Sequence, residues 1–176
     1  LIFGASGRLG GALASCLAAR GYRLELQAFR HPERCAAVQG ARVHTLDLRQ
    51  PERIKELAKT LKDSGERLDA LVWAAGVVRD QIAARLTQEA VREVLAVNLC
   101  GFFGACKHFS RQFLRQRSGA VVALSSHAAF TGRVGGAAYS MAQSGVLAAV
   151  KSMAREWGPS GIRINAVVPP FIRDSA

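Results

Sequence analysis

The sequence predicts an α/β protein built on a doubly wound parallel sheet, and two observations lead to this prediction. Six short apolar runs alternate with helical patterns along the 176 residues, which is the order that parallel βαβ units require. The first run enters a glycine-rich turn, Gly4-Ala-Ser-Gly7-Arg-Leu-Gly10, and a helix follows. A glycine-rich turn between a strand and a helix is where such sheets bind dinucleotides. We therefore expect the strand order 3-2-1-4-5-6.

The elements of the first half follow from the apolar pattern and its breaks. Residues 1–3 form the end of a strand, and the helix at 11–20 is closed by Gly21, a residue suited to a helix C-terminus. A second strand at 23–29 completes a βαβ unit, the context that supports dinucleotide binding. The remaining elements of this half are a strand at 43–46, a helix at 51–62, and a strand with its exit turn at 69–76.

In the second half, a long helical pattern at 88–116 contains Val97-Asn98-Leu99. Asparagine is unfavourable inside a helix, so Asn98 either is merely tolerated or has a specific reason to be there. The apolar run 120–124 predicts a buried strand. The helix predicted at 139–157 carries apolar residues at helical spacing, and a sixth strand is predicted at 162–168.

A serine and a tyrosine stand at the predicted carboxyl edge of the sheet. Ser126 follows the strand 120–124, and Tyr139 opens the next helix thirteen residues later. Gln143 lies one turn after Tyr139 on the same helix face. Open α/β folds place their chemistry in loops at the carboxyl ends of strands. Without further context, a buried serine and a core tyrosine are the better explanation of the two residues.

The formal charge of +11 raises the question of a polyanionic partner. The arginines are spread along the chain without a basic tail, a pattern that argues against nucleic-acid binding. One local feature stands out, because Lys107, Arg111 and Arg115 recur at helical spacing and share a helix face. This face is either an ordinary solvated surface or a site for an acidic partner.

The remaining composition excludes several classes of protein. The four cysteines and four histidines are scattered without metal-ligand spacing, so we expect reduced thiols, no metal site and a cytoplasmic location. No apolar run approaches the about 20 residues of a membrane helix. The first residues do not form a signal peptide, and we interpret the chain as a core truncated at both ends.

The glycine turn, Val97-Asn98-Leu99 and the spacing of Ser126 and Tyr139 together resemble the short-chain dehydrogenase/reductase family across essentially the whole chain. The closest likeness within it is to the 3-oxoacyl-carrier-protein reductases. The resemblance implies one NAD(P)-binding Rossmann domain over 1–176, without the family's seventh strand, and a homo-oligomer (a dimer or a tetramer). The family's tyrosine is followed by a lysine four residues later, whereas this chain has Gln143.

Three further departures from the family pattern affect the expected site. The turn Trp73-Ala74-Ala75-Gly76 replaces Asn-Asn-Ala-Gly, which removes side chains expected to brace the cofactor loop. Pro170 replaces a glycine and is expected to stiffen the mouth of the site. In the glycine turn itself, Arg8 stands where the family usually has a glycine.

The resemblance also implies the cofactor and the residues that contact it. The second strand ends without an acidic residue, and Arg30, with Arg8 nearby, favours the 2′-phosphate of NADP(H) over NAD(H). Asp47 is expected beside the adenine, or alternatively as the cap of the helix at 51–62. The implied cofactor contacts are Gly4, Ser6, Gly7, Arg8, Leu9, Gly10, Arg30, Asp47, Leu48, Ala74, Ala75, Gly76, Tyr139, Gln143 and Pro169.

The activity implied by the resemblance is the reduction of a ketone by NADPH. Tyr139 would donate a proton to the developing alkoxide, and Ser126 would hydrogen-bond the same oxygen. Asn98 would anchor a water of the proton relay, and Gln143 would bind the nicotinamide ribose without a charge. The substrate is expected to be a small ketone, such as a 3-oxoacyl thioester of an acidic acyl-carrier protein. The alternative is a nucleotide-binding regulator or structural subunit without turnover.

Overall fold

The computed structural model describes residues 1–169, so Pro170 and its expected effect lie outside the described residues. Six strands form one sheet in the order β3-β2-β1-β4-β5-β6, and every neighbouring pair is parallel. The predicted doubly wound order is therefore confirmed. The strands are β1 (Ile2–Phe3), β2 (Glu25–Ala28), β3 (Arg42–Thr45), β4 (Ala70–Trp73), β5 (Gly119–Leu124) and β6 (Ile162–Val167).

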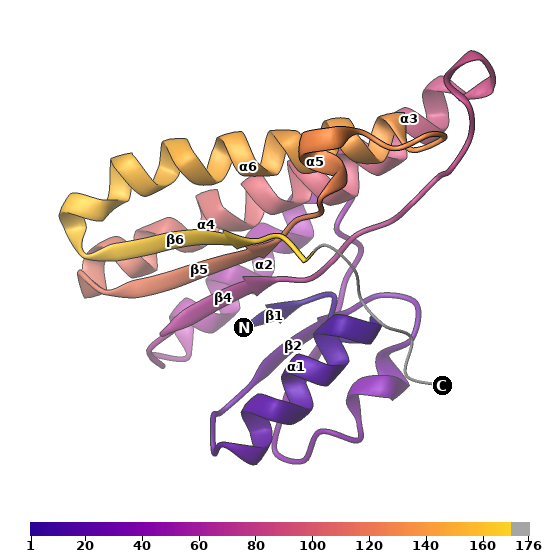
Figure 1. Ribbon diagram of the computed structural model, residues 1–176. Helices are drawn as coiled ribbons and strands as arrows, with labels where there is room; N and C mark the ends of the chain where they lie inside the picture. The colour runs from indigo at the N-terminus through magenta and orange to yellow at the C-terminus, as the bar shows by residue number, and fades with distance from the viewer. Residues whose placement is uncertain (170–176) are drawn as a thin grey trace.

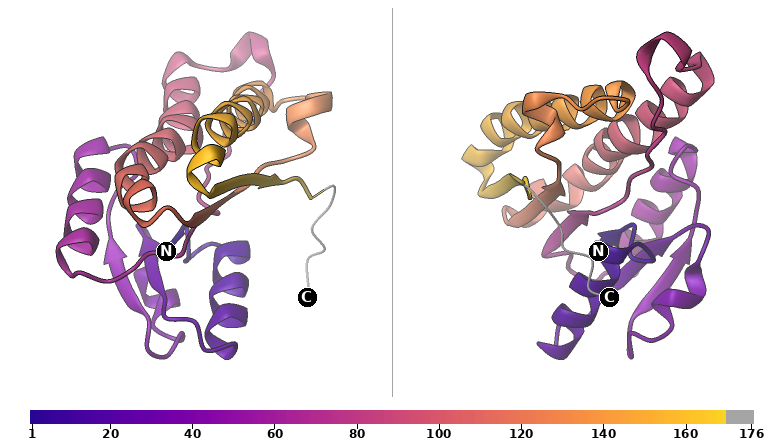
Figure 2. Two further views of the ribbon diagram at one scale, coloured as in Figure 1. Left: turned by 90° about the vertical axis from the view of Figure 1, so that its left-hand side faces the viewer. Right: turned by 45° about the vertical axis from the view of Figure 1, so that its right-hand side comes forward.

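Helices cover both faces of the sheet (Figure 1). Helices α2, α4 and α6 lie on one face, and α1 lies on the other, as the turned views also show (Figure 2). The helices are α1 (Arg8–Ala19), α2 (Pro51–Asp63), α3 (Gln88–Leu95), α4 (Phe102–Gln116), α5 (Ala128–Thr131) and α6 (Ala137–Trp157). Short 3₁₀ turns are η1 (Pro32–Cys35), η2 (Ala83–Arg85) and η4 (Gly158–Ser160), and η3 (Ala96–Gly101) is a π-helical turn.

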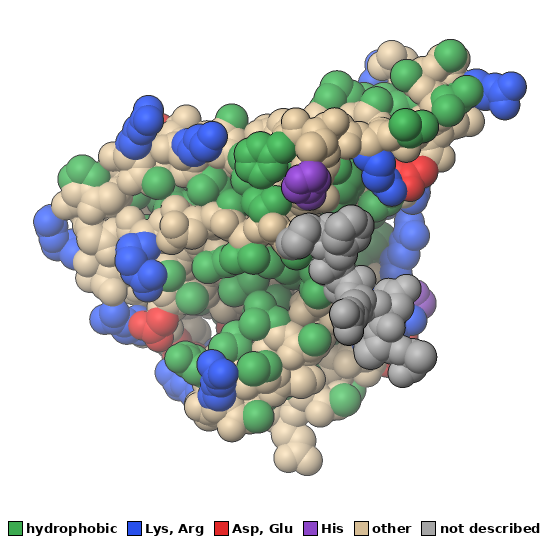
Figure 3. Space-filling model, in the orientation of Figure 1, with side chains coloured by type: hydrophobic (Ala, Val, Ile, Leu, Met, Phe, Trp, Pro, Cys, Tyr) green, Lys and Arg blue, Asp and Glu red, His purple; other side chains and the backbone are tan. Residues whose placement is uncertain are grey.

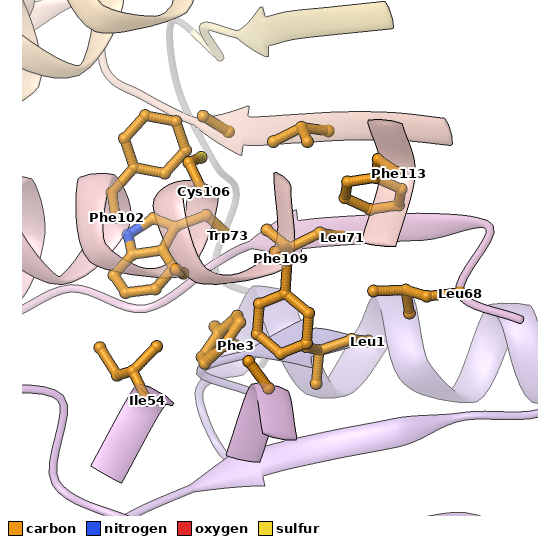
Figure 4. Packing of buried hydrophobic residues seen from close by; sticks show 14 of the residues in the cluster. Leu1, Phe3, Ile54, Leu68, Leu71, Trp73, Phe102, Cys106, Phe109 and Phe113 are labelled. Atoms are coloured by element: carbon orange, nitrogen blue, oxygen red, sulfur yellow. The ribbon is translucent and has the colours of Figure 1, made fainter. Parts of the chain in front are cut away.

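The larger core lies between the sheet and the layer of α2, α4 and α6, and aromatic rings fill its centre (Figure 4). The ring of Trp73 packs 5.0 Å from that of Phe3 and 5.9 Å from that of Phe102, measured between centroids. Tilted and edge-on ring pairs of this kind add to the stability gained from burial alone. Gly101 makes room for Trp73, because a Cβ there would lie 3.1 Å from the indole ring.

The long helical pattern predicted at 88–116 is not one regular helix. It is α3 and α4 joined by the π-helical turn η3, in which Asn98 is almost fully buried at 1% exposure. A π-helical turn inserts one extra residue into the helical repeat, and such turns occur frequently at functional sites. The apolar periodicity of this stretch is compatible with either geometry, so the sequence did not distinguish them.

The turn after β1 depends on close backbone contact. Gly4 adopts a φ of +77°, and a Cβ on it would lie 2.5 Å from the Cα of Ala75. A Cβ on Gly10 would lie 2.2 Å from the carbonyl oxygen of Gly4. Neither position accepts a side chain without displacing backbone, so α1 and the exit of β4 are held directly against this turn. The helix itself begins at Arg8, three residues before its predicted start.

Basic side chains are distributed over the molecular surface, and on the face drawn in Figure 3 they clearly outnumber acidic ones. Within residues 1–169, no helix is both long enough and apolar enough to cross a bilayer. The same range holds no group of three or more His, Cys, Asp or Glu side chains arranged to bind a metal ion.

Candidate active site

Two cavities adjoin each other at the carboxyl ends of the strands. The first has a volume of about 270 Å³ and the second about 280 Å³, and the residues 74–76 after β4 line both. The first is lined by Gly4, Ser6, Gly7, Gln27, Phe29, Arg30, Asp47, Leu48, Arg49, Ala74, Ala75, Gly76, Val77, Glu93 and Val97. The second is lined by Leu9, Ala74, Ala75, Gly76, Val78, Leu124, Ser125, Ser126, Tyr139, Gln143 and Pro169.

Gln27 supports the glycine turn from below. Its side chain is buried on β2, where its Oε1 accepts a hydrogen bond from the amide of Gly4 at 2.9 Å. Its Nε2 donates to the carbonyl of Leu46 at 2.8 Å, and its backbone carbonyl accepts from the amide of Ala5 at 2.9 Å. One side chain thus fixes the exits of β1 and β3 relative to β2. The sequence reasoning passed over Gln27, although a glutamine within an apolar strand was a detectable signal.

The end of the first cavity that lies after β2 and β3 combines cationic and aromatic side chains. Arg49 pairs with Asp47 through its guanidinium at 2.6 Å, and its backbone amide donates to the same carboxylate. This hydrogen bonding to Arg49 holds the pKa of Asp47 below its ordinary value. The Arg49 guanidinium also lies 5.8 Å from the ring centroid of Phe29. Asp47 and Arg30, two of the expected cofactor contacts, line this cavity, and so does Arg49, two residues after Asp47, which was missed.

Asp47 does not cap the following helix, which settles one of the two alternatives for this residue. The residue at the N-cap of α2 is Gln50, and it makes no side-chain capping hydrogen bond. Asp47 instead uses its carboxylate for Arg49 within the loop. Its side chain is therefore held in place beside the cavity rather than at the helix terminus.

Asn98 braces the loop that leaves β4. Its Oδ1 accepts a hydrogen bond from the amide of Val77 at 2.8 Å, and its Nδ2 donates to the carbonyl of Val77 at 3.0 Å. This loop has Trp73 and Ala74 where the family has two asparagines. It is held instead by Asn98, which belongs to the π-helical turn. Asn98 does not line either cavity, but it holds the backbone of Val77, which lines the first. This pairing is the structural reason for an asparagine in the helical stretch.

The second cavity brings Ser126, Tyr139 and Gln143 together. Ser126 ends the loop after β5, and its hydroxyl accepts a hydrogen bond from the amide of Ala128 at 3.2 Å. The neighbouring Ser125 donates to the backbone carbonyl of Gln143 at 3.3 Å, which joins this loop to α6. Tyr139 and Gln143 are one turn apart on α6, as predicted.

Gln143 lines this cavity and has a buried acceptor without a partner. The side chain is 5% exposed, and within residues 1–169 its Oε1 has no hydrogen-bond donor. A buried acceptor without a partner costs about 1–3 kcal/mol, and a bound donor would remove this cost. A ribose hydroxyl is a donor of the required kind.

Arg133 is a cation near the phenol that the sequence did not reveal. Its guanidinium lies 5.9 Å from the ring centroid of Tyr139 and forms an ion pair with Asp80. The backbone amide of Gln81 donates to the carbonyl of Gly135 at 2.8 Å, which joins the same two loops. Both charged side chains are about half exposed, so solvent and Asp80 screen the positive charge. Arg133 therefore fixes the loop and the ring and does not replace a buried cation.

Most predicted cofactor contacts line one of the two cavities, and two do not. Arg8 is exposed on the first turn of α1 and lines neither cavity. Gly10 is buried against Gly4, where its role is close packing of α1. The cavity residues that sequence reasoning missed are Gln27, Phe29, Arg49, Val77, Glu93 and Val97 in the first cavity, and Val78, Leu124 and Ser125 in the second.

This arrangement fits a nicotinamide dinucleotide. The two cavities share one wall, as the two halves of a dinucleotide require. Gly4 and Gly7 line the first cavity beside the N-terminus of α1, where backbone amides can bind a pyrophosphate. Arg30 lies at one end and the free acceptor of Gln143 at the other. Both termini of such a ligand thus meet side chains able to bind them.

Comparison with known proteins defines the class to which this fold and site belong. The sequence matches the short chain dehydrogenase family over residues 1–176. The chain belongs to this family of oxidoreductases, as its motifs indicated, and the family implies a nicotinamide cofactor.

Individual relatives also match over nearly the whole chain. The chain is 32% identical to a 3-oxoacyl-[acyl-carrier-protein] reductase of Synechocystis sp., with 98% of this chain and 73% of the relative covered. It is 31% identical to carbonyl reductase family member 4 of Xenopus tropicalis, with 97% and 74% covered. Among solved structures, an NAD⁺-bound xylitol dehydrogenase superposes with a TM-score of 0.93 at 25% identity, covering 99% of this chain and 70% of that one.

The role of Gln27 yields a direct prediction. Gln27→Leu keeps the approximate volume but leaves the amide of Gly4 and the carbonyl of Leu46 without their partners. We expect the free energy of unfolding to fall by about 1–3 kcal/mol, the cost of unsatisfied buried groups. Urea unfolding measures this change. Gln88→Leu, at an exposed position, is the control, and an equal effect in both variants would contradict the assigned role.

Proposed function

We propose that this protein reduces a ketone to an alcohol with NADPH at the second cavity. The observation that carries the proposal is the convergence of Ser126 and Tyr139 on one cavity whose wall, at Ala75 and Gly76, also belongs to the dinucleotide-shaped first cavity. A carbonyl group placed there would lie between a hydroxyl, a phenol and the nicotinamide end of the cofactor.

The chemistry divides between the cofactor and the protein. When bound, a reduced nicotinamide supplies a hydride to the carbonyl carbon. Tyr139 donates its phenolic proton to the carbonyl oxygen as negative charge develops there. Ser126 donates a hydrogen bond to the same oxygen and stabilises that charge. Asn98, which holds the backbone of Val77, keeps the loop after β4 in place.

Gln143 biases the site toward reduction. A free phenol has a pKa of about 10, so about 0.1% is phenolate at neutral pH. Alcohol oxidation needs the phenolate, which a neighbouring ammonium would stabilise, whereas ketone reduction needs the neutral phenol. Gln143 offers the ribose a hydrogen bond but no charge. The missing lysine therefore costs oxidation more than reduction, and Arg133 compensates little because it is paired with Asp80.

The proposed preference for NADPH is based on the side chains at the end of the first cavity that lies after β2 and β3. Arg30 lines this cavity, and β2 ends without a carboxylate that would repel a 2′-phosphate. Two acids line this cavity: Asp47, which pairs with Arg49, and Glu93, which pairs with Arg79. The NAD⁺-bound xylitol dehydrogenase shows that the same fold also accepts the other cofactor, so the choice depends on these side chains.

The substrate class is inferred from the relatives. Several are named 3-oxoacyl-[acyl-carrier-protein] reductases, so we propose a 3-oxoacyl thioester or a similar small ketone, reduced by a homo-oligomer. The competing function is nucleotide binding without turnover, favoured by Gln143 in place of a lysine. NADPH consumption with a panel of β-keto thioesters separates the two. Binding of NADPH without consumption of any ketone would support the non-catalytic alternative.

The assignment of the phenol predicts a large loss of activity from a small change. Tyr139→Phe removes one oxygen from a half-buried ring, so we expect folding to survive and ketone reduction to fall about 10²-fold or more. Ser126→Ala should cost a comparable factor. Steady-state rates with NADPH measure both. Tyr22→Phe, at the only other tyrosine, is the control, and unchanged turnover in both site variants would place the chemistry elsewhere.

The cofactor assignment predicts a preference and its reversal. We expect NADPH to bind at least about tenfold more tightly than NADH, which corresponds to roughly 1.4 kcal/mol. Arg30→Asp should abolish this preference, because it removes a cation and adds a charge that repels the 2′-phosphate. Arg34→Asp makes the same charge change at an exposed position outside the cavity. Equal dissociation constants for the two cofactors in the unmodified protein, measured by calorimetry, would reject the assignment.

A further inference from the structure

Tyr139 lies in the first turn of α6, and the start of this helix has little support of its own. Gly136 is the N-cap, so the cap residue has no side chain with which to bind the first amides of the helix. The loop before it turns through Gly132 and Gly135, whose φ angles of +67° and +72° are in the left-handed region. Glycines lose more conformational freedom on folding than other residues, so the backbone of such a loop holds itself only weakly. The position of the Tyr139 ring therefore depends on contacts with other parts of the chain.

These contacts come from the loop after β4, residues 74–82, which passes the loop before α6 (Figure 1). The backbone amide of Gln81 donates a hydrogen bond to the carbonyl of Gly135 at 2.8 Å. Beside this bond, the Arg133 guanidinium forms an ion pair with Asp80. The two charged residues are 53 positions apart in the sequence, so their pairing joins two loops that meet only when the chain folds.

The loop after β4 is itself held at two points, so it can support another loop. Asn98 binds both backbone groups of Val77. Arg79 donates two hydrogen bonds to Glu93 on α3, at 2.7 and 2.9 Å, and two-pronged pairs of this kind are among the stronger ones. Asp80 follows directly, so its carboxylate projects from a backbone that is already fixed.

Arg133 contacts the first turn of α6 in two ways. Its guanidinium carbon lies 5.9 Å from the ring centroid of Tyr139, within the range of a cation–π interaction. Its side chain also crosses the backbone closely, because a Cβ on Gly136 would lie 2.9 Å from the Arg133 Nε. A displacement of Arg133 would therefore change the surroundings of the ring and of the backbone that carries it.

The setting of the Asp80–Arg133 pair separates it from an ordinary surface ion pair. The two side chains are 48% and 47% exposed, and exposed ion pairs contribute little to the free energy of folding. Arg53 and Glu56 form a pair of similar exposure, 50% and 61%, but they are three residues apart on one helix. The Asp80–Arg133 pair instead joins two loops and contacts the phenol ring.

We propose that Asp80 and Arg133 are positioning residues for the proton donor. The carboxylate holds the guanidinium over the Tyr139 ring, and the guanidinium holds the phenol at the second cavity. Among residues 1–169, the side chains that line this cavity include Tyr139 but neither Asp80 nor Arg133, so both act through the phenol. The effect on turnover rests on the proposed reduction, whereas the placement of the ring does not depend on it.

The placement of the ring can be tested without turnover. The chain has two tyrosines, so in a Tyr22→Phe background the NMR ring signals of labelled tyrosine report Tyr139 alone. Arg133→Gln should shift these signals because the guanidinium is removed from the ring. Asp80→Ala should shift them as well, because the carboxylate no longer holds the guanidinium there. Unchanged Tyr139 signals in Asp80→Ala would overturn the proposal, whether or not the protein reduces ketones.

The same variants should slow the reaction without weakening the binding of its reactants. We expect Arg133→Gln and Asp80→Ala each to lower kcat at least about tenfold, because a misplaced proton donor reacts inefficiently. KM for the ketone and Kd for NADPH should stay nearly unchanged. Because the two residues act as one unit, the double variant should lose no more than the larger single loss. Arg53→Gln, which breaks the pair of similar exposure on α2, should leave kcat unchanged.

The kinetic outcomes separate this role from the reaction itself. Unchanged kcat in both single variants of a protein that reduces ketones would overturn the proposal, and so would losses that multiply in the double variant. A protein that reduces no ketone, but in which both variants shift the Tyr139 signals, would reject the proposed function and still support the placement of the ring.

Exchanging the two charges separates the ring contact from a simple link between loops. Asp80→Arg combined with Arg133→Asp restores an ion pair but moves the guanidinium to the opposite loop, so we expect kcat to stay at the level of the single variants. Arg133→Lys keeps a cation that can reach both Asp80 and the ring, so it should retain most of kcat. Full recovery of kcat by the exchanged pair would show that joining the loops is sufficient and would overturn the role assigned to the guanidinium.

Discussion

The candidate active site depends on the direct backbone contact between the turn after β1 and the exit of β4. Gly4 approaches Ala75 so closely that no Cβ fits between them, and Gly10 approaches Gly4 in the same way. This contact forms the wall that the two cavities share. The chain stabilises it twice, by Gln27 beneath the turn and by Asn98 beneath the loop at Val77. The position of every cavity residue is set relative to this contact.

The fold and the main site residues were predictable because they depend on periodic patterns and on fixed spacing. Alternating apolar runs and helical patterns determine the parallel sheet order, and the carboxyl ends of its strands bring Ser126 and Tyr139 to the same edge. These features depend on backbone geometry, which short sequence motifs specify well.

The missed features depend on contacts between distant segments. Gln27 is informative only once β1 and β3 are known to flank β2, and Arg133 only once its loop meets Asp80. The π-helical turn at Asn98 follows the same apolar rhythm as an α-helix, so periodicity alone did not reveal it. Arg49 lay two residues from a predicted site residue, yet its pairing with Asp47 is a matter of side-chain geometry.

The central claim concerns the missing cation beside the phenol. Gln143 presents a buried acceptor without a donor, and Arg133 is exposed and paired, so no buried positive charge among the described residues faces Tyr139. The measurement that tests this most directly compares alcohol oxidation and ketone reduction in the unmodified protein and in Gln143→Lys across pH. We expect lysine to raise oxidation more than reduction and to move the oxidation profile about one unit lower in pH. Brisk oxidation at neutral pH by the unmodified protein, or an equal gain in both directions, would contradict the account.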